Sequence, residues 1–316
     1  MEIKDSKIKP KHRTSIGGQA LIEGVMMRGP EKISIAVRKP DGEIEVKVDE
    51  LETLGMKYKF FTLPFIRGVV GLIEAMLIGT KALMYSAEFF EEEEVAEPKI
   101  SLFEKIFKDK AADAEMVFAL ILSMVLALGI FMIIPSFLTN VFKNIVKNPI
   151  ALNLIEGVIR ISLFLIYVIW VSKLDDVKRV FEYHGAEHKS IHCYENELPL
   201  TVENVKKFPI LHGRCGTSFL FMVMIISIFV LSFFGWPSPL QRVLIRIAMF
   251  PVIAGISYEI NRIIGRSSSK LCYALSYPGL MLQKLATVKE PDDSQIQVAI
   301  DALVAVIPMD KALDTW

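Results

Sequence analysis

Histidine is scarce in this chain and is concentrated in one region. Four of the five histidines lie between residues 184 and 215, together with two of the three cysteines. Imidazole nitrogens and thiolates are preferred ligands of zinc and related divalent ions in proteins. The clustering therefore indicates a metal site, whose candidate ligands are His184, His188, His192, His212 and Cys215.

The first part of this cluster contains a pattern known from metal-dependent hydrolases. Residues 184–188 read His-Gly-Ala-Glu-His, which matches H-x-x-E-H. In that pattern two imidazoles hold a metal ion while the glutamate polarises a water molecule. Glu187 is therefore the candidate catalytic base.

The spacing of the histidines predicts that they share one side of a helix. If the second membrane span runs on as a helix through residues 181–195, the 100° step places four side chains within about 80° of one another: His184, His188, His192 and Glu195. Cys193 falls on the opposite side and is the weakest ligand candidate. Glycines beside His212 and Cys215 allow the following segment to bend toward this helix. Such a set with one open position suits Zn²⁺ or a related divalent ion.

A simpler interpretation of the same residues stays open. Histidines on a cytosolic helix beside a membrane can be solvated or hydrogen-bonded to lipid headgroups. Glu187, with Lys189 or Lys207, can equally be surface charge. The H-x-x-E-H pattern is what favours metal binding over this alternative.

The elements that must position these residues belong to a membrane protein. Hydrophobic residues make up 52% of the 316-residue chain, and its mean hydropathy is +0.42. That composition is too apolar for two soluble domains. With 36 basic and 36 acidic residues the chain has no net field that would collect nucleic acid, so none is expected as a partner.

Four segments have the length and apolarity of transmembrane helices: 116–140, 150–172, 217–235 and 239–261. The loop at 173–216 carries seven Lys and Arg residues, against two between the first pair of spans. By the positive-inside rule, this loop and both termini are cytoplasmic. The chain is therefore expected to be a multi-pass protein of the cell membrane.

Two further apolar segments are expected to lie in the membrane interface. Residues 64–85 are long enough to span, but Arg67, Glu74 and Lys81 recur at heptad spacing on one helical face. An interfacial or re-entrant helix is favoured, and a fifth span that places the N-terminus outside is the alternative. Residues 271–286 are too short to span and contain a Pro-Gly pair.

The N-terminal region predicts a small antiparallel β element at 16–50. Its expected strands are 19–27, 33–39 and 43–51, and Pro40-Asp41-Gly42 between the last two is a hairpin signal. At the other end, the tail from Pro291 predicts a helix that begins at an Asp/Ser cap.

The predicted fold is a mostly α-helical polytopic membrane protein, with about four transmembrane helices, interfacial or re-entrant helices and this small N-terminal β element. Its expected domains are an N-terminal cytosolic β element, an interfacial helix with an acidic linker, a first transmembrane pair, a cytosolic His/Cys segment, a second transmembrane pair and C-terminal cytosolic or interfacial helices: 1–62, 63–114, 115–172, 173–216, 217–262 and 263–316.

Several arginines are candidates for holding an anionic substrate group. Glu156 and Arg160 stand at i and i+4 inside the second span, where intramembrane charge is costly and must be paired or functional. A structural pair between these two is the simpler reading. Arg246, deep in the last span, and Arg214, beside the histidines, complete the candidate set with Arg160.

Several strings resemble one known family. They are IGGQALIEGVMMRGP at 16–30, FEYHGAEHKSIHCYE at 181–195, LHGRCGTSFL at 211–220 and EPDDSQIQVAI at 290–300. The chain resembles the YqhQ-like bacterial membrane proteins, a family of unknown function commonly labelled as metal-dependent enzymes. The resemblance implies metal ligands at His184, His188 and His212 and names no substrate. The chain lacks the downstream third-ligand motif of soluble metallopeptidases with H-x-x-E-H, which argues against a peptidase.

Two functions from different classes fit these observations. The first is a membrane-embedded metal-dependent hydrolase acting on a lipid or another membrane-associated substrate. The second is a non-enzymatic membrane protein, either a transporter or an accessory factor that docks a cytosolic protein, with a structural metal site or none. An enzyme keeps an open metal position with a base beside it, whereas a structural site closes its shell with four protein ligands.

Overall fold

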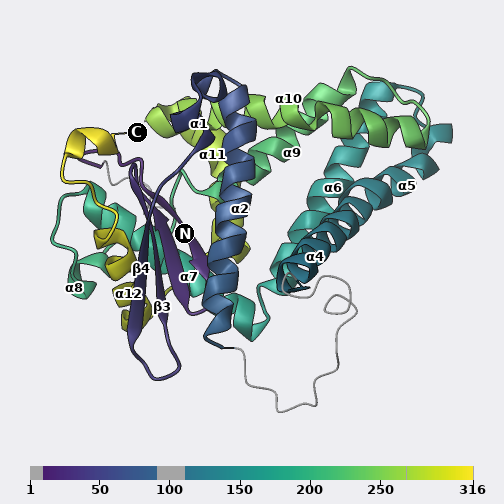
Figure 1. Ribbon diagram of the computed structural model, residues 1–316. Coiled ribbons are helices and arrows are strands. Elements are labelled where there is room, and N and C mark those ends of the chain that lie inside the picture. Colours follow the sequence, from purple (N-terminus) through teal and green to yellow (C-terminus); the bar gives the residue numbers. More distant parts are fainter. Residues whose placement is uncertain (1–9, 91–110, 268, 316) are drawn as a thin grey trace, which may run out of the picture. The chain divides into compact units, whose positions relative to one another are not determined.

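The computed structural model describes residues 10–90, 111–267 and 269–315 (Figure 1). It is mostly helical with a small antiparallel sheet near the N-terminus, as predicted. Contacts divide the chain into two compact units. The first comprises Met1–Phe90, Ile166–Ile226 and Phe250–Trp316, and the second comprises Glu91–Leu165 and Ser227–Met249. The predicted acidic linker following residue 90 lies outside the described residues.

The sheet of the first unit is a four-stranded meander in the order β1-β2-β3-β4. Its strands are β1 (Gly17–Leu21), β2 (Gly24–Arg28), β3 (Lys32–Arg38) and β4 (Ile44–Glu50). The predicted turn at residues 40–42 is confirmed, with Gly42 at a φ of +90° and its N–H donating to the carbonyl of Lys39 at 2.9 Å. Glycine adopts this left-handed conformation without steric cost.

The segment predicted as one strand at 19–27 is two strands, β1 and β2, so the single-strand prediction was wrong. They are joined by a tight turn at Ile22 and Glu23, and Glu23 has a φ of +48°. Neither turn residue is glycine or asparagine, so the usual signal is missing. The Glu23 carboxylate instead accepts hydrogen bonds from Arg179 and from the Tyr183 hydroxyl at 3.1 Å. Tertiary contacts therefore hold this turn.

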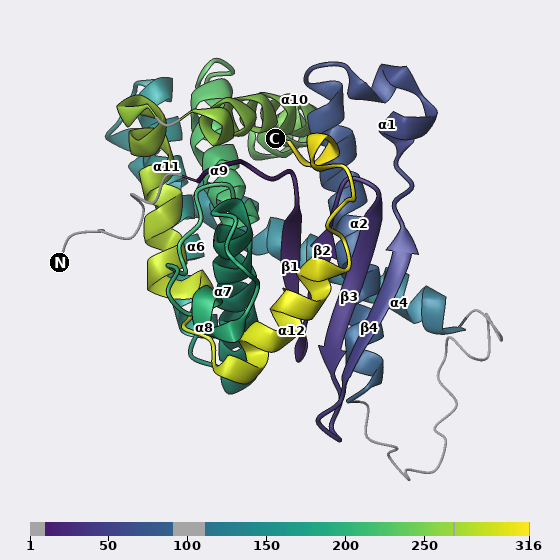
Figure 2. The same ribbon diagram turned by 90° about the vertical axis from the view of Figure 1, so that its left-hand side faces the viewer.

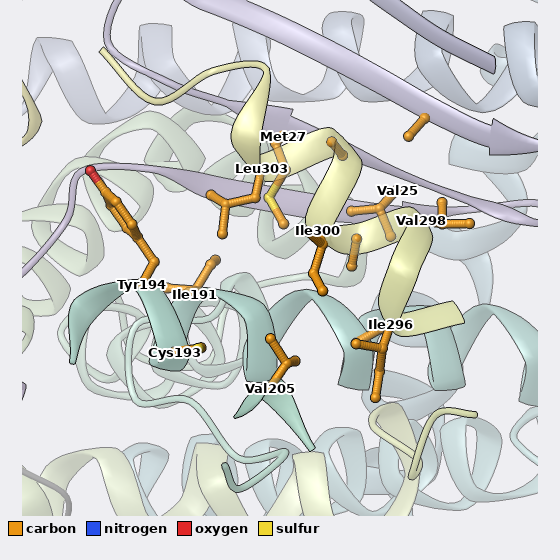
Figure 3. Packing of buried hydrophobic residues seen from close by; sticks show 14 of the residues in the cluster. Val25, Met27, Ile191, Cys193, Tyr194, Val205, Ile296, Val298, Ile300 and Leu303 are labelled. Atoms are coloured by element: carbon orange, nitrogen blue, oxygen red, sulfur yellow. The ribbon is translucent and has the colours of Figure 1, made fainter. Parts of the chain in front are cut away.

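Strands β2 and β3 are covered on both faces, because successive strand side chains point to opposite sides, whereas β4 is mostly exposed. Met27 faces a core formed with helices α7 (Asp175–Glu195) and α12 (Asp293–Val304), which lie across one side of the sheet (Figure 2). Figure 3 shows residues of β2 in this core opposite side chains of α12, with Ile191 of α7 beside them. Met26 faces the other way, toward Ala82 of α2 (Ile66–Glu88).

The helix that carries the histidines is separate from the span before it. Helix α6 (Pro149–Val171) ends, a short turn follows, and α7 begins with two acidic residues in its first turn, which complement the positive end of the helix dipole. The continuous helix assumed from the sequence is therefore broken, although 181–195 is helical as predicted. The predicted cap of α12 is confirmed as a capping box between Asp292 and Gln295.

Two of the three heptad charges of α2 have partners within the first unit. Arg67 pairs with Glu259 at 2.5 Å, and Glu74 contacts Arg28 at 3.6 Å. The chain reaches α2 through the short helices α1 (Leu54–Lys57) and η2 (Lys59–Thr62). Thus one side of α2 packs on protein, while other residues of the helix, Met76 and Leu77, are exposed.

Four helical runs within the described residues are long and apolar enough to cross a membrane: Ile66–Glu88, Val117–Asn144, Pro149–Val171 and Pro239–Arg266. Helix α9 (Gly216–Ser232) is apolar but has 17 residues. The number of long apolar helices is thus as expected. However, the set of four includes Ile66–Glu88 and does not include the expected segment 217–235.

The remaining helices complete the element order. They are α4 (Ala111–Leu128), η4 (Gly129–Ile133), α5 (Ile134–Asn140), η5 (Val141–Asn144), α8 (Val202–Val205), α10 (Pro239–Arg266), α11 (Lys270–Leu282), η6 (Gln283–Thr287) and η7 (Lys311–Asp314).

Candidate metal centre

The predicted ligands converge in the first unit, and they form two groups of three. The first group is His184, His188 and Cys215, and the second is His192, Glu195 and His212. Within each group one ligand atom per residue lies within 4.8 Å of the others. The sequence predicted five of these six residues as ligands and placed Glu195 on the same helical face, but it did not predict the division into two groups.

The first group joins one turn of α7 to the start of α9. The Nε2 atom of His184 lies 3.2 Å from the Cys215 sulfur, and the rings of His184 and His188 are 4.4 Å apart at their centres. Imidazole and thiolate together are a donor set typical of zinc. Because the group contains three protein ligands among the described residues, a tetrahedral ion bound here would keep one position open.

The second group lies one turn further along α7. The ring centres of His192 and His212 are 4.7 Å apart, and a Glu195 oxygen lies 3.9 Å from Nε2 of His212. Glu195 also accepts hydrogen bonds from the backbone N–H of Thr14 at 2.9 Å and from Arg214. His188 and His212 are neighbours across the two groups, with ring centres 5.4 Å apart.

Each histidine of α7 has one ring nitrogen against a backbone carbonyl. Nδ1 of His184 lies 2.8 Å from the Thr287 oxygen, and Nδ1 of His188 lies 2.6 Å from that of Ile210. Nε2 of His192 lies 2.9 Å from the oxygen of Leu211. A carbonyl can only accept, so each of these ring nitrogens carries its proton, and the other nitrogen keeps a lone pair for a metal. This arrangement is typical of histidine ligands in metalloproteins.

A residue that the sequence did not single out positions His212. Gln283 of η6 is fully buried. Its side-chain oxygen accepts from the His212 N–H at 3.0 Å, and its side-chain nitrogen donates to the His212 carbonyl at 2.9 Å. Gln283 and the Thr287 carbonyl come from the C-terminal third of the chain, and no motif links them to the histidines. Sequence reasoning had no signal to find them.

Burial favours the neutral form of three of the imidazoles, which is the form that metal coordination requires. It lowers the pKa of His188 to about 4 and also lowers the pKa of His192 and the pKa of His212. Burial alone would raise the pKa of the Cys215 thiol, but His188 and hydrogen bonds with Thr217 lower it overall. The thiolate, which is the form that binds metal, is thereby favoured.

Glu187, the candidate base, belongs to neither group and lies beside the first. One carboxylate oxygen accepts the Gly18 N–H of β1 at 3.0 Å, and the other lies 3.8 Å from Nε2 of His184. Burial raises the pKa of Glu187 to about 7, against the opposing effect of His184. An added Cβ at Gly18 would lie 2.9 Å from Cγ of Glu187, so a glycine is needed for this approach. The resemblance strings include Gly18, although its contact with Glu187 was not foreseen.

A cavity of about 570 Å³ opens beside the second group. Its lining includes His192, Glu195, His212 and Arg214. Of the three predicted anion-binding arginines, Arg214 is therefore the one placed at the histidines.

The other two arginines, Arg160 and Arg246, lie in the second unit. Arg246 pairs with the buried Glu156, and Arg160 donates to the same carboxylate at 3.0 Å. The predicted structural pair of Glu156 and Arg160 is confirmed. Arg242 approaches the other oxygen of Glu156 at 3.9 Å. These guanidinium groups belong to an ion-pair cluster of their own and do not line the cavity.

Comparison with known proteins places the chain in a family. A curated relative of Bacillus subtilis (strain 168), "Uncharacterized protein YqhQ", is 37% identical over 305 residues, which cover 92% of each chain. No solved structure matches the chain. The family model described as "Protein of unknown function (DUF1385)" matches residues 63–309, a span that includes both ligand groups and the Glu187 base. The chain therefore belongs to the DUF1385 family.

Proposed function

We propose that this protein is a membrane-embedded metal-dependent hydrolase that acts on a membrane-associated substrate. One observation carries the proposal: the histidines of α7 each have one ring nitrogen on a backbone carbonyl, which leaves the other nitrogen for a metal, and all three belong to the candidate ligand groups. In metalloproteins, a hydrogen bond of this kind fixes the orientation of the imidazole and determines which ring nitrogen is free to bind the metal. Solvated surface histidines would not need three separate carbonyl acceptors.

The donor sets suit zinc or a related divalent ion. The first group offers two imidazoles and a thiolate, and the second offers two imidazoles and a carboxylate. Three protein donors with an open position are typical of catalytic rather than structural zinc sites. The count of three in each group supports hydrolysis over the structural site of the alternative function.

The residues around the first group have defined roles in such a reaction. A divalent ion supplies Lewis acidity, which makes water easier to deprotonate and polarises the bond to be broken. Glu187 lies beside His184 without joining the ligand group, so it can accept the proton of the attacking water. The Gly18 N–H holds one carboxylate oxygen and leaves the other directed toward His184.

The packing of the first unit supports a specific membrane arrangement. Ser34 of β3 donates to the Ala302 carbonyl of α12 at 2.6 Å, and β1 contacts Glu187 of α7. The sheet, α7 and α12 must therefore lie on the same side of the membrane. It follows that the chain crosses an even number of times between the sheet and α7, and again between α7 and α12.

This parity selects the spans. Among the described residues between the sheet and α7, the candidates are α2, Val117–Asn144 and α6. Helix α2 packs on the sheet and pairs Arg67 and Glu74 with protein, so it is the interfacial helix and the other two cross. Between α7 and α12, crossing by α10 requires crossing by α9, although α9 has only 17 residues. Because basic residues are in excess in 173–216, we propose that the sheet, α7 and both termini are cytoplasmic.

Metal analysis combined with two substitutions tests the hydrolase. Purified wild-type protein should hold near-stoichiometric zinc or a related ion, measured by plasma mass spectrometry, and His184→Ala should lose it. Glu187→Gln keeps size and hydrogen bonding but removes basicity, so it should retain metal and fold while failing to complement a deletion strain. Glu203→Gln, an exposed carboxylate paired only with Lys207, is the control and should complement.

Two results would contradict the proposal. Folded, fully functional wild-type protein without metal removes the metal site altogether. Complementation by Glu187→Gln at wild-type level, with metal still bound, removes catalysis and leaves the structural or accessory role.

A further inference from the structure

The cavity beside the second ligand group has the size of a ligand site. Its volume of about 570 Å³ falls within the range of small-molecule and cofactor pockets. Besides His192 and His212, the end of α10 and the first half of α11 line it, together with Arg13 from the N-terminal segment. All of these elements belong to the first unit.

Positive charge prevails in the lining of this cavity. Arg13, Arg214 and Lys270 contribute three cations, and Glu195 is the one carboxylate among the lining residues. Even with Arg214 paired to Glu195, the cavity favours an anion.

Hydroxyl groups accompany these cations. Ser267, Ser269 and Ser276 line the same cavity. Ser269 caps the N-terminus of α11, with its oxygen accepting from the Cys272 N–H at 3.2 Å. Guanidinium forks together with hydroxyl donors match the several oxygens of a phosphoryl group better than the two oxygens of a carboxylate.

The rest of the lining is apolar and lies next to a surface suited to lipid. Ile264 and Leu280 line the cavity. Leu271, Leu275 and Tyr277 of α11 are exposed, directly after the C-terminal end of α10, one of the four helices long enough to span. A ligand here can have a phosphoryl group at the cations and an apolar remainder toward the membrane.

We infer that the cavity binds a phosphate ester through its phosphoryl oxygens and that this ester is the substrate class of the hydrolase. The second ligand group lines the cavity, and its His212 joins the cavity to the first group, because the ring centres of His212 and His188 are 5.4 Å apart. The inference rests on the proposed function. In the reaction one water is consumed: a bond forms between its oxygen and phosphorus, the P–O bond to the alcohol breaks, and the two protons of water are shared between phosphate and alcohol. The ester can come from a lipid headgroup or from a soluble metabolite, because both present the same phosphoryl group.

Binding to the intact, detergent-solubilised protein tests this inference by isothermal titration calorimetry. The two probes are glycerol 3-phosphate and a short-chain phosphatidylglycerol. Lys270→Gln and Arg13→Gln should each weaken binding of the preferred probe by about tenfold or more, since each removes a charge-assisted contact. Lys284→Gln removes an exposed lysine of η6 that does not line the cavity and should bind as wild type does.

The arms of the experiment separate the possible results. Binding of the lipid alone assigns a headgroup, binding of glycerol 3-phosphate alone assigns a soluble ester, and either result supports the inference when Lys270→Gln weakens it. Wild-type protein that binds neither probe, or binding unchanged in Lys270→Gln, overturns the inference. Lys270 is exposed, so this variant should fold even if Arg13→Gln, which loses a hydrogen bond to the Gly265 carbonyl, does not.

Metal content measured on the same samples distinguishes this failure from that of the hydrolase. Protein that retains metal but binds no phosphate ester contradicts the substrate class alone. Protein without metal that still binds the ester through Lys270 contradicts the hydrolase and supports phosphate recognition by the cavity.

Discussion

Gly185, the second residue of the H-x-x-E-H pattern, lies where α7 packs closely against residues 289–291. A Cβ added at Gly185 would lie 2.0 Å from the carbonyl oxygen of Lys289 and 3.2 Å from Cδ of Pro291. This close packing allows the Lys289 N–H to donate to the carbonyl oxygen of Phe181 at 2.9 Å. It also brings Nδ1 of His184 to 2.8 Å from the carbonyl oxygen of Thr287. We therefore predict that Gly185→Ala disturbs the metal site without altering any ligand.

The size of the effect follows from this distance. Contacts of a Cβ below 3.0 Å essentially do not occur, so a contact of 2.0 Å requires a shift of at least about 1 Å. Overpacking of this kind costs about 1–3 kcal/mol, which corresponds to a fall in Tm of roughly 2–4 °C per kcal/mol. Loss of the contact that orients His184 should weaken metal binding by roughly 10–100-fold, as for other partners of metal ligands.

Zinc affinity measured by competition with a chromophoric chelator, alongside thermal unfolding in detergent, checks this prediction. Gly213→Ala is the matched control: Gly213 adjoins the ligand His212, but an added Cβ there meets nothing within 4 Å. The control should keep wild-type affinity and Tm. If Gly185→Ala also binds zinc within twofold of wild type, the approach of α7 to residues 287–291 does not position His184, and the reasoning fails.

Three further predictions follow from other parts of the chain. Asp292→Ala should lower the free energy of unfolding by about 0.5–2 kcal/mol by removing the α12 cap, and Asp292→Asn by less. Hydrogen bonds lower the pKa of Asp292 from 3.8 despite burial, so in wild type this stabilisation is complete above pH 3.8 and is lost as the pH falls below it. A denaturation series across pH measures the loss. Cys272 should be alkylated faster than Cys193, because hydrogen bonds with serine hydroxyls lower the pKa of the half-buried Cys272 while burial raises that of Cys193 to about 11; mass spectrometry after brief iodoacetamide treatment would show equal rates if this is wrong. On intact cells an impermeant thiol reagent should label Lys147→Cys and spare Lys206→Cys until the membrane is permeabilised, and the reverse pattern would invert the topology.

The local sequence pattern was sufficient to predict features that form within a single helix or turn. Helical spacing placed the α7 histidines on one face, and the turn at residues 40–42 and the cap at Asp292 have short signatures that the structure reproduces. In each case the determining atoms lie within a few residues of one another. The metal ligands themselves stay a prediction, and His212 and Cys215 reach the α7 histidines only through the fold.

The division of the ligands into two groups was not predictable, because it depends on contacts between distant segments. His212 is paired with His192 rather than His188 where Gln283, 71 residues away, holds its backbone. The β1–β2 turn likewise depends on Glu23 being held by residues more than 150 positions later. No periodicity or composition carries such information, since each residue type is ordinary at its position.

The ligands and the groups that orient them come from different parts of the chain, and this has a consequence for assembly. All the ligands lie between residues 184 and 215, whereas Gly18 precedes the first span and Gln283 and Thr287 follow the last. Long-range contacts of this kind are made only after the loop entropy of the intervening chain has been lost. The N-terminal segment is in turn joined to the C-terminus, where the Thr14 hydroxyl bonds the buried Asp314. The histidines can therefore take their oriented form only when the sheet and the C-terminal helices have docked on α7. The proposed metal site thus depends on the completed fold.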